Sequence, residues 1–105
     1  MYTRNVSMKL KVNSAKEFTQ TLENDVIPVL RKQKGFKDEI TLIAPERNDA
    51  VGISFWDRKE DAESYNREKY PEILKTLSKV VEGTPRVELF EVANSTSHQI
   101  AAKAA

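Results

Sequence analysis

One indole, one phenol and two carboxamides are the side chains of this sequence with the most scope for chemistry. Trp56 is the only tryptophan among 105 residues, and Tyr65 and Asn66 follow it in a charged segment. Asn5 stands near the N-terminus, among alternating apolar and polar residues. These groups can surround a flat, polar aromatic molecule and hydrogen-bond to it. The alternative is that Trp56 packs in an interface and Tyr65 in the core, as aromatic residues at helical spacing commonly do.

Other kinds of site lack their usual residues. The sequence has no cysteine, and its single histidine, His98, lies near the C-terminus, so neither a metal cluster nor a Ser-His-Asp or Cys-His system is expected. The three glycines are scattered and form no phosphate-binding loop. The carboxylate pairs Asp38-Glu39 and Glu60-Asp61 stand among lysines and arginines, which is typical of a solvated face. We therefore expect neither a metal nor a cofactor.

Charge and hydropathy narrow the class of protein. The formal net charge is +1 with 31% charged residues, so no basic excess is present to bind a nucleic acid backbone. No run approaches the ~20 apolar residues of a membrane span, and no signal peptide is visible. We expect a soluble cytoplasmic protein with one domain at 1–94 and a polar tail at 95–105.

Hydrophobic periodicity predicts six main elements. Alternation is typical of a half-buried strand, and apolar residues at helical spacing are typical of an amphipathic helix. Pro28 lies inside the first helix, where we expect a kink. The predicted elements are a strand at 4–12, a helix from Ser14 to Gly35, strands at 36–44 and 50–56, a helix from Asp57 to about Lys69 that continues from Pro71 to Gly83, and a strand at 86–92.

The order strand, helix, strand, strand, helix, strand predicts a ferredoxin-like α+β fold, βαββαβ, with a four-stranded antiparallel sheet. Right-handed crossovers place the first strand between the third and the fourth. Two helices can cover only one face of such a sheet. The other face stays open.

Side-chain alternation assigns residues to the two faces. Val6, Met8, Leu10, Ile40, Leu42, Val51, Ile53, Phe55, Val87 and Leu89 are expected under the helices. The open face is expected to carry Trp56, Phe90, Val92 and Ile43, which are large for side chains left in water. This predicts a homodimer through the open face of the sheet. The alternative is a solvated sheet with scattered apolar residues.

The same alternation predicts where a site would form. Asn5 and Trp56 are expected on one face at one end of the sheet, because the first and third strands are antiparallel neighbours. The helix that follows Trp56 starts at that end and brings Tyr65 within reach. We expect Asn5, Trp56 and Tyr65 to be the catalytic residues. The expected substrate-binding residues are Ser7, Ser54, Asn66 and Phe90.

Three segments resemble a known family. "VIPVLRKQKGF" (26–36), "AVGISFWDRKEDAESY" (50–65) and "GTPRVELFEV" (83–92) are similar to the antibiotic biosynthesis monooxygenase (ABM) domain family. The resemblance covers nearly the whole chain up to about residue 93. It implies a dimeric α+β barrel with a small-molecule pocket in each subunit.

The resemblance also implies an activity. Known members include cofactor-independent monooxygenases that oxidise polyketide-type phenols, with Asn, Trp and Tyr side chains binding the substrate and assisting its deprotonation. Asn5, Trp56 and Tyr65 match those residue types here. Other members degrade haem with a histidine in the second helix, and this sequence has none there. The alternative function is a non-catalytic dimeric module that binds a small hydrophobic ligand, in a stress or sensing role.

Overall fold

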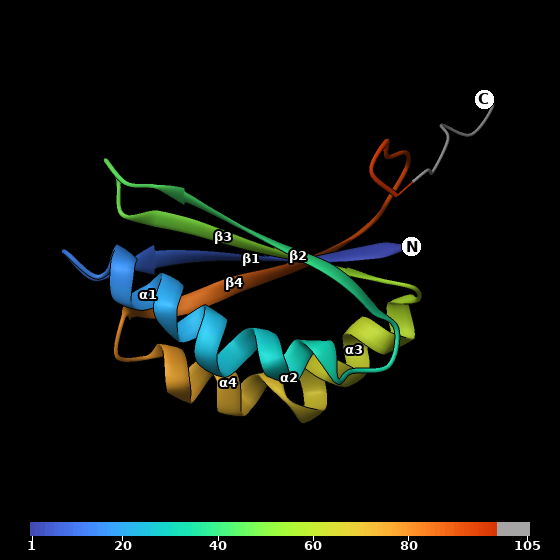
Figure 1. Ribbon diagram of the computed structural model, residues 1–105, viewed down its shortest axis with the longest axis horizontal. Helices are drawn as coiled ribbons and strands as arrows, with labels where there is room; N and C mark the ends of the chain where they lie inside the picture. Colours follow the sequence, from blue (N-terminus) through green and yellow to red (C-terminus); the bar gives the residue numbers. More distant parts are fainter. Residues whose placement is uncertain (99–105) are drawn as a thin grey trace.

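Figure 1 shows a four-stranded antiparallel sheet with helices packed on one of its faces. The computed structural model describes residues 1–98. The strands lie in the order β2-β3-β1-β4, and neighbouring strands are antiparallel. Their bounds are Tyr2–Leu10 for β1, Phe36–Ala44 for β2, Asp49–Trp56 for β3 and Val81–Glu91 for β4. The predicted ferredoxin-like α+β fold is confirmed.

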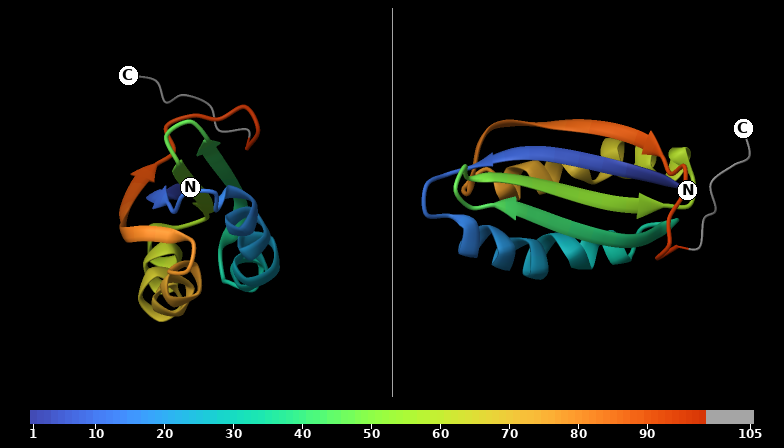
Figure 2. Two further views of the ribbon diagram at one scale, coloured as in Figure 1. Left: turned by 90° about the vertical axis from the view of Figure 1, so that its left-hand side faces the viewer. Right: turned by 90° about the horizontal axis from the view of Figure 1, so that it is seen from above.

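Two helical segments run side by side beneath the sheet, as the end-on view in Figure 2 shows. Phe18, Leu22, Val26 and Leu30 recur every four residues in the first segment, and all are buried. The first segment consists of α1 (Ala15–Thr21), the π-helical turn η1 (Leu22–Val26) and α2 (Ile27–Arg31), and the second of α3 (Lys59–Glu68) and α4 (Tyr70–Leu77). Among residues 1–98, no helix has the length and apolar character needed to cross a membrane.

Pro28 accounts for the π-helical turn. A proline inside a helix lacks an N–H and crowds the carbonyl four residues earlier, which here belongs to Asn24. The backbone accommodates it with a wider turn, in which the N–H of Ile27 bonds to the carbonyl of Leu22, five residues back. The predicted kink therefore takes the form of η1, and Leu22 and Val26 remain buried.

The second helical segment ends earlier than predicted. It stops at Leu77, and β4 begins at Val81 rather than at 86. Gly83 does not end a helix but lies within β4, with a φ angle of +66°, where pairing with β1 shifts between Ser7 and Lys9. Residues 83–85 of β4 lie opposite Met8 alone, so β4 bulges by two residues there, and glycine suits the left-handed backbone of this bulge.

The faces predicted for β1 and β4 agree with the strand pairing, but those predicted for β2 and β3 are wrong. In β1, Val6 and Met8 face the helices as predicted. Arg4 pairs with Ser54 and Tyr2 with Trp56, and residues directly opposite in a sheet point to the same side. Trp56 and Ile43, which were expected on the open face, are therefore on the helix side, and the same alternation brings Glu39, Thr41, Gly52 and Ser54 there with them. Five residues expected under the helices are on the open face: Ile40, Leu42, Val51, Ile53 and Phe55.

The core lies between the sheet and the helices. Its largest fully buried side chains are Trp56, Phe18, Leu10 and Val80. The "AVGISFW" segment of β3 is apolar at both alternations, so hydropathy could not choose between its faces. The indole of Trp56 decides the register, because the core buries it completely.

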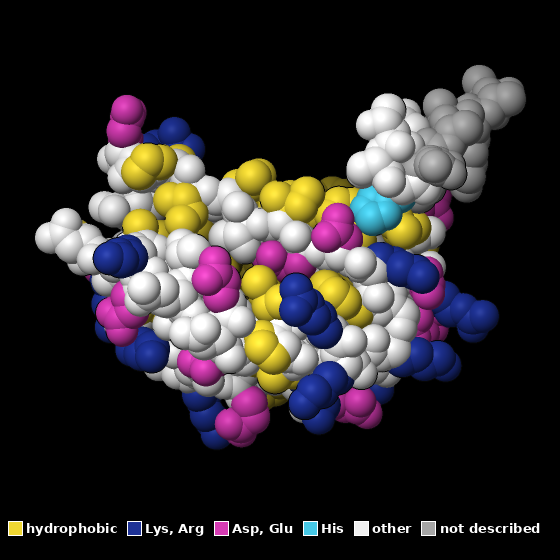
Figure 3. Space-filling view, in the orientation of Figure 1, with side chains coloured by type: hydrophobic (Ala, Val, Ile, Leu, Met, Phe, Trp, Pro, Cys, Tyr) yellow, Lys and Arg dark blue, Asp and Glu magenta, His cyan; other side chains and the backbone are white. Residues whose placement is uncertain are grey.

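The open face is more apolar than predicted. Ile40, Leu42 and Phe90 are 43%, 52% and 50% exposed there. Figure 3 shows apolar side chains along the upper surface of the molecule. The first tail residues border this surface: the His98 ring lies 4.7 Å from that of Phe55, and Nε2 of His98 lies 3.6 Å from a carboxylate oxygen of Asp38. The rest of the predicted tail, 99–105, lies outside the described residues.

Gly35 joins the first helical segment to β2 at a close approach to α3. Its φ angle is +79°, and a Cβ atom there would lie 2.1 Å from a carboxylate oxygen of Asp61. Gly83 has a similar φ of +66°, but a Cβ atom added there would have no other atom within 4 Å. An alanine at Gly83 would therefore meet backbone strain alone, whereas an alanine at Gly35 would meet backbone strain and steric overlap.

We expect Gly83→Ala to lower the free energy of unfolding by about 1–2 kcal/mol, the cost of a left-handed backbone for an L-residue. Gly35→Ala should cost about 1–3 kcal/mol more, because overpacking adds to the same strain. Urea unfolding of both variants measures the difference. Equal losses of stability in the two variants would show that the side chain of Asp61 can move away from the added Cβ atom at no cost.

Candidate active site

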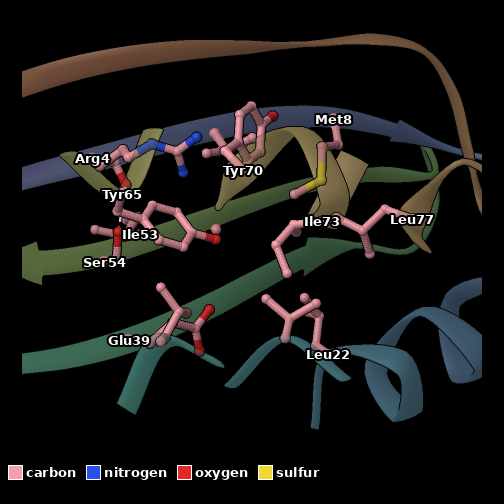
Figure 4. Close-up of a pocket in the computed structure, with 14 residues that line it drawn as sticks. Arg4, Met8, Leu22, Glu39, Ile53, Ser54, Tyr65, Tyr70, Ile73 and Leu77 are labelled. Carbon is pink, nitrogen blue, oxygen red and sulfur yellow. Dashed lines mark hydrogen bonds between the residues drawn. The ribbon is translucent and has the colours of Figure 1, made fainter. Parts of the chain in front are cut away.

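A small cavity lies between the sheet and the two helical segments. Its volume is about 50 Å³, and the view in Figure 4 looks into it. The walls are mainly apolar, from β1, the first helical segment and α4. The polar side chains among its lining residues are Arg4, Glu39, Ser54, Tyr65 and Tyr70.

Arg4 is the buried cation of this cavity. It belongs to β1, shares the helix side with Val6, and is 3% exposed. Its Nε and one terminal nitrogen donate to the carboxamide oxygen of Asn66, at 3.1 and 2.8 Å. No ion pair links it to a carboxylate within residues 1–98. Burial lowers the pKa of the guanidinium, although the neighbouring tyrosines Tyr65 and Tyr70 oppose that effect.

Two tyrosines hold the guanidinium between them. The central carbon of Arg4 lies 5.0 Å from the ring centre of Tyr65 and 4.0 Å from that of Tyr70. Such contacts contribute about 0.5–2 kcal/mol each. Burial raises the pKa of the Tyr65 hydroxyl to about 12 and also raises the pKa of Tyr70. Both phenols are therefore neutral hydrogen-bonding groups at physiological pH.

Trp56 supports this cluster without lining the cavity. Its ring centre lies 5.4 Å from that of Tyr65 and 5.6 Å from that of Phe36. The indole N–H donates to the hydroxyl of Ser54 at 2.8 Å, inside the core. The indole is thus already bonded and fixes the orientation of Tyr65.

Glu39 faces the cavity from β2, across from Arg4 in Figure 4. Burial is the main cause that raises the pKa of its carboxyl group, and the hydroxyl of Thr41, which donates to it at 2.5 Å, lowers it in part. A carboxylate that burial makes more basic can accept a proton from a bound hydroxyl group. Arg4 and Glu39 are therefore an unpaired cation and an unpaired base on one cavity.

The structure brings four of the predicted site residues together and separates three. Trp56, Tyr65, Ser54 and Asn66 surround or contact the Arg4 cluster. The predicted neighbourhood of Asn5 and Trp56 is wrong, because Asn5 pairs with Ile53 and points to the open face. Ser7 and Phe90 lie on that open face too. The catalytic and binding roles assigned from the sequence remain predictions.

Sequence reasoning missed Arg4, Tyr70 and Glu39. Arg4 has the same alternation as Val6, so a charge at a buried strand position was the available signal. Glu39 was attributed to a solvated face because it stands in a charged segment among lysines and arginines. Among residues 1–98, no group of three or more histidine or acidic side chains converges as a metal site would require.

Comparison with known proteins identifies the fold. No protein-family model matches the sequence, and a search of curated proteins gives no significant match. A monooxygenase of Streptomyces coelicolor, from the gene ActVA-Orf6 and solved with nanaomycin D, is 12% identical with a TM-score of 0.75, over 90% of this chain and 88% of that one. An antibiotic biosynthesis monooxygenase is 8% identical with a TM-score of 0.69, over 88% and 98%. The chain therefore shares its fold with these two monooxygenases.

The same fold also occurs in a protein without an assigned activity. A protein of unknown function from Nitrosomonas europaea is 11% identical with a TM-score of 0.74, over 90% of this chain and 91% of that one. At such identities the similarity concerns the fold. The resemblance seen in the sequence is confirmed at that level, and the dimeric barrel stays a prediction.

Burial of Glu39 makes protein stability depend on pH. A carboxyl group whose pKa is raised by folding contributes stability below its unfolded-state pKa and loses it as the pH rises through the folded-state pKa. Glu39→Gln should therefore gain stability relative to the parent protein between about pH 4 and pH 7. Denaturant unfolding at both pH values measures this change.

The control is the same substitution at Glu46, which is exposed in the turn between β2 and β3. A stability difference for Glu39→Gln that stays constant with pH would contradict the burial of this carboxyl group.

Proposed function

We propose that this protein is a cofactor-independent monooxygenase that oxidises a small quinol in the cavity between sheet and helices. The observation that carries the proposal is the placement of Glu39 and Arg4 on one largely apolar cavity. A base there can ionise a phenolic hydroxyl, and a cation can stabilise the anion that results. The shared fold with monooxygenases supports the same assignment.

The proposed reaction needs only dioxygen besides the quinol. Glu39 accepts the proton of one hydroxyl group, and the ionised ring transfers electrons to dioxygen. One oxygen atom enters the ring and the other leaves as water, so that quinol and O₂ give hydroxyquinone and H₂O. The quinol itself supplies the electrons that reduce the second oxygen atom.

The other residues of the cluster bind the substrate or hold the reacting side chains in position. Tyr65 keeps its proton up to a pH of about 12 and can donate a hydrogen bond to the phenolate oxygen. Trp56 and Ser54 hold Tyr65 and the backbone of β1 in place. Asn66 orients the guanidinium of Arg4 through its carboxamide oxygen. Positioning of this kind lowers a barrier without a cofactor.

The cavity size limits the substrate. A volume of about 50 Å³ is far below the ~300–1,000 Å³ of pockets for drug-sized ligands. It is also below the ~150 Å³ of a cavity that holds benzene, so even a single ring with small substituents requires the lining side chains to move apart. We therefore propose a monocyclic quinol rather than a polycyclic substrate.

We also propose that two copies associate through the open face. Ile40, Leu42 and Phe90 supply an apolar surface there that a second sheet would cover. The carboxamide oxygen of Asn5 is buried on this face with no hydrogen-bond partner within residues 1–98. A partner subunit would give that oxygen a donor and would shield Ser7 as well.

A second candidate function is ligand binding without turnover. The full burial of Trp56 favours it, because an indole sealed in the core and bonded to Ser54 cannot contact a substrate. The same cavity would then bind a small aromatic molecule and release it unchanged. Dioxygen consumption separates the two functions.

We expect dioxygen uptake with hydroquinone or methylhydroquinone, and one atom of ¹⁸O₂ in the product by mass spectrometry. Glu39→Gln should lower the rate by about 100-fold or more, the usual contribution of a general base. Glu46→Gln makes the same charge change on the exposed turn and should retain the parent rate. Uptake no faster than without protein across the panel would reject the enzyme and favour the binding module.

Two lysine substitutions, one on the open face and one away from it, test the proposed dimer. Leu42 on the open face is 52% exposed, and Val12, in the loop after β1, is 71% exposed. Leu42→Lys should convert a dimer to a monomer because it places a charge in the apolar interface. Val12→Lys should remain dimeric. Sedimentation velocity measures both, and a monomeric parent protein at micromolar concentration would exclude the dimer.

A further inference from the structure

We propose that the substrate of this cavity is a hydroxylated aromatic acid, whose carboxylate pairs with Arg4 while its phenolic hydroxyl faces Glu39. This inference rests on the proposed function for the identity of the cavity as a substrate site. It goes further in naming the charge of the substrate and the residue that recognises it: Arg4 binds the carboxylate in place of the phenolate, and Tyr65 remains the donor to the phenolate oxygen.

The first argument is the missing counter-ion of Arg4. Arginine is almost never fully buried unless it is paired, and an unpaired buried charge is costly. Arg4 is 3% exposed, and its hydrogen-bonded partner is the neutral carboxamide of Asn66. No carboxylate of residues 1–98 forms an ion pair with it. A ligand carboxylate would supply the absent negative charge.

The second argument is the set of free donors. A guanidinium carries five N–H donors in a planar fork. Two nitrogens donate to Asn66, and the rings of Tyr65 and Tyr70 lie against the guanidinium at 5.0 and 4.0 Å. The remaining donors stay in the plane of the fork, which suits the two oxygens of a carboxylate. In Figure 4 the guanidinium lies between the two tyrosines at the cavity wall.

The third argument is a second polar group beside the guanidinium. The hydroxyl group of Tyr70 is buried and donates to no group among residues 1–98, and Arg4 lies against it and in part lowers its pKa. Tyr70 lines the same cavity and stacks on Arg4. A carboxylate bound to Arg4 would accept from this hydroxyl group too. One ligand group would thus satisfy both.

The far side of the cavity fixes the other end of the ligand. Glu39 lies across the cavity from Arg4 and forms no ion pair with it. A carboxylate ligand placed at Glu39 would be repelled, whereas a hydroxyl group would donate to it. Apolar side chains line the rest of the cavity, Met8 and Leu22 among them, and suit an aromatic ring. The arrangement therefore selects both a ligand class and an orientation.

The probe pair is 4-hydroxybenzoate and its neutral analogue 4-hydroxybenzamide. Trp56 is the only tryptophan and lies 5.4 Å from the Tyr65 ring, so its fluorescence reports binding at the cavity. Calorimetry gives the dissociation constants independently. We expect the acid to bind about 10- to 100-fold more tightly than the amide, as charge-assisted hydrogen bonds do. Equal affinities, or no saturable binding of the acid, would overturn the inference.

Asn66→Asp tests the counter-ion argument directly. It places a carboxylate on the guanidinium where the carboxamide oxygen now lies, at 2.8–3.1 Å. The substitution should raise the melting temperature and weaken binding of the acid at least tenfold, because Arg4 is then paired within the chain. Asn24→Asp makes the same change on the exposed side of the first helical segment and should leave binding unchanged.

Arg4→Met removes the cation and should abolish the preference for the acid over the amide. If this variant fails to fold, Asn66→Asp still tests whether Arg4 binds the carboxylate, because that substitution keeps every element of the core. Undiminished acid binding by Asn66→Asp would overturn the inference.

The carboxylate site and the monooxygenase activity can each be rejected without rejecting the other. Binding of the acid without dioxygen uptake would reject the monooxygenase and leave the carboxylate site standing. Oxidation of neutral quinols at the same rate as hydroxylated acids would support the monooxygenase and reject the carboxylate site. Neither measurement relies on the other.

Discussion

The buried guanidinium of Arg4 is the interaction on which the rest of the structure depends. It leaves the central strand β1 on the helix side, bonds to Asn66 of α3 and stacks on Tyr70 of α4. The side chain thereby ties the middle of the sheet to both halves of the second helical segment. Tyr65 completes the contact, and Trp56 packs on Tyr65. A charge held this way cannot pack as a hydrocarbon does, so the layers stay apart at this point and a cavity results.

Much of the fold could be predicted because the sequence repeats its periods cleanly. Phe18, Leu22, Val26 and Leu30 mark one helix, and Val6, Met8 and Leu10 mark one strand face. The failure came in β2 and β3, where "ITLI" and "AVGISFW" are apolar at both alternations. The sequence of such a strand does not show which of its faces is buried, because both faces carry apolar residues, one for the core and one for the open surface. Their register is set by pairing with β1, which involves residues far away in sequence.

The same error shaped the predicted site. Trp56, Tyr65, Ser54 and Asn66 were chosen by residue type and proximity in sequence, and they do gather. Asn5 was joined to them by an inverted face and lies on the other side of the sheet. Arg4 and Glu39 escaped notice for a physical reason: charged residues are usually solvated, and only tertiary packing reveals one that is not. The local alternation of β1 held the clue to Arg4, whereas nothing local could have identified Glu39.

The π-helical turn has a consequence for how such a cavity can change. Leu22 and Val26 begin and end η1, and both line the cavity together with Leu30 beyond the turn. A π-helical turn has one residue more than an α-helical turn. Deleting one residue there would remove the extra residue and close the turn to α-helical geometry, so α2 would keep the same face toward the cavity. Leu30 would stay in the cavity wall, and the change would be confined to the side chains of the turn itself. The wide turn thus lets the chain carry one more residue of length without rotating the rest of the helix away from the core.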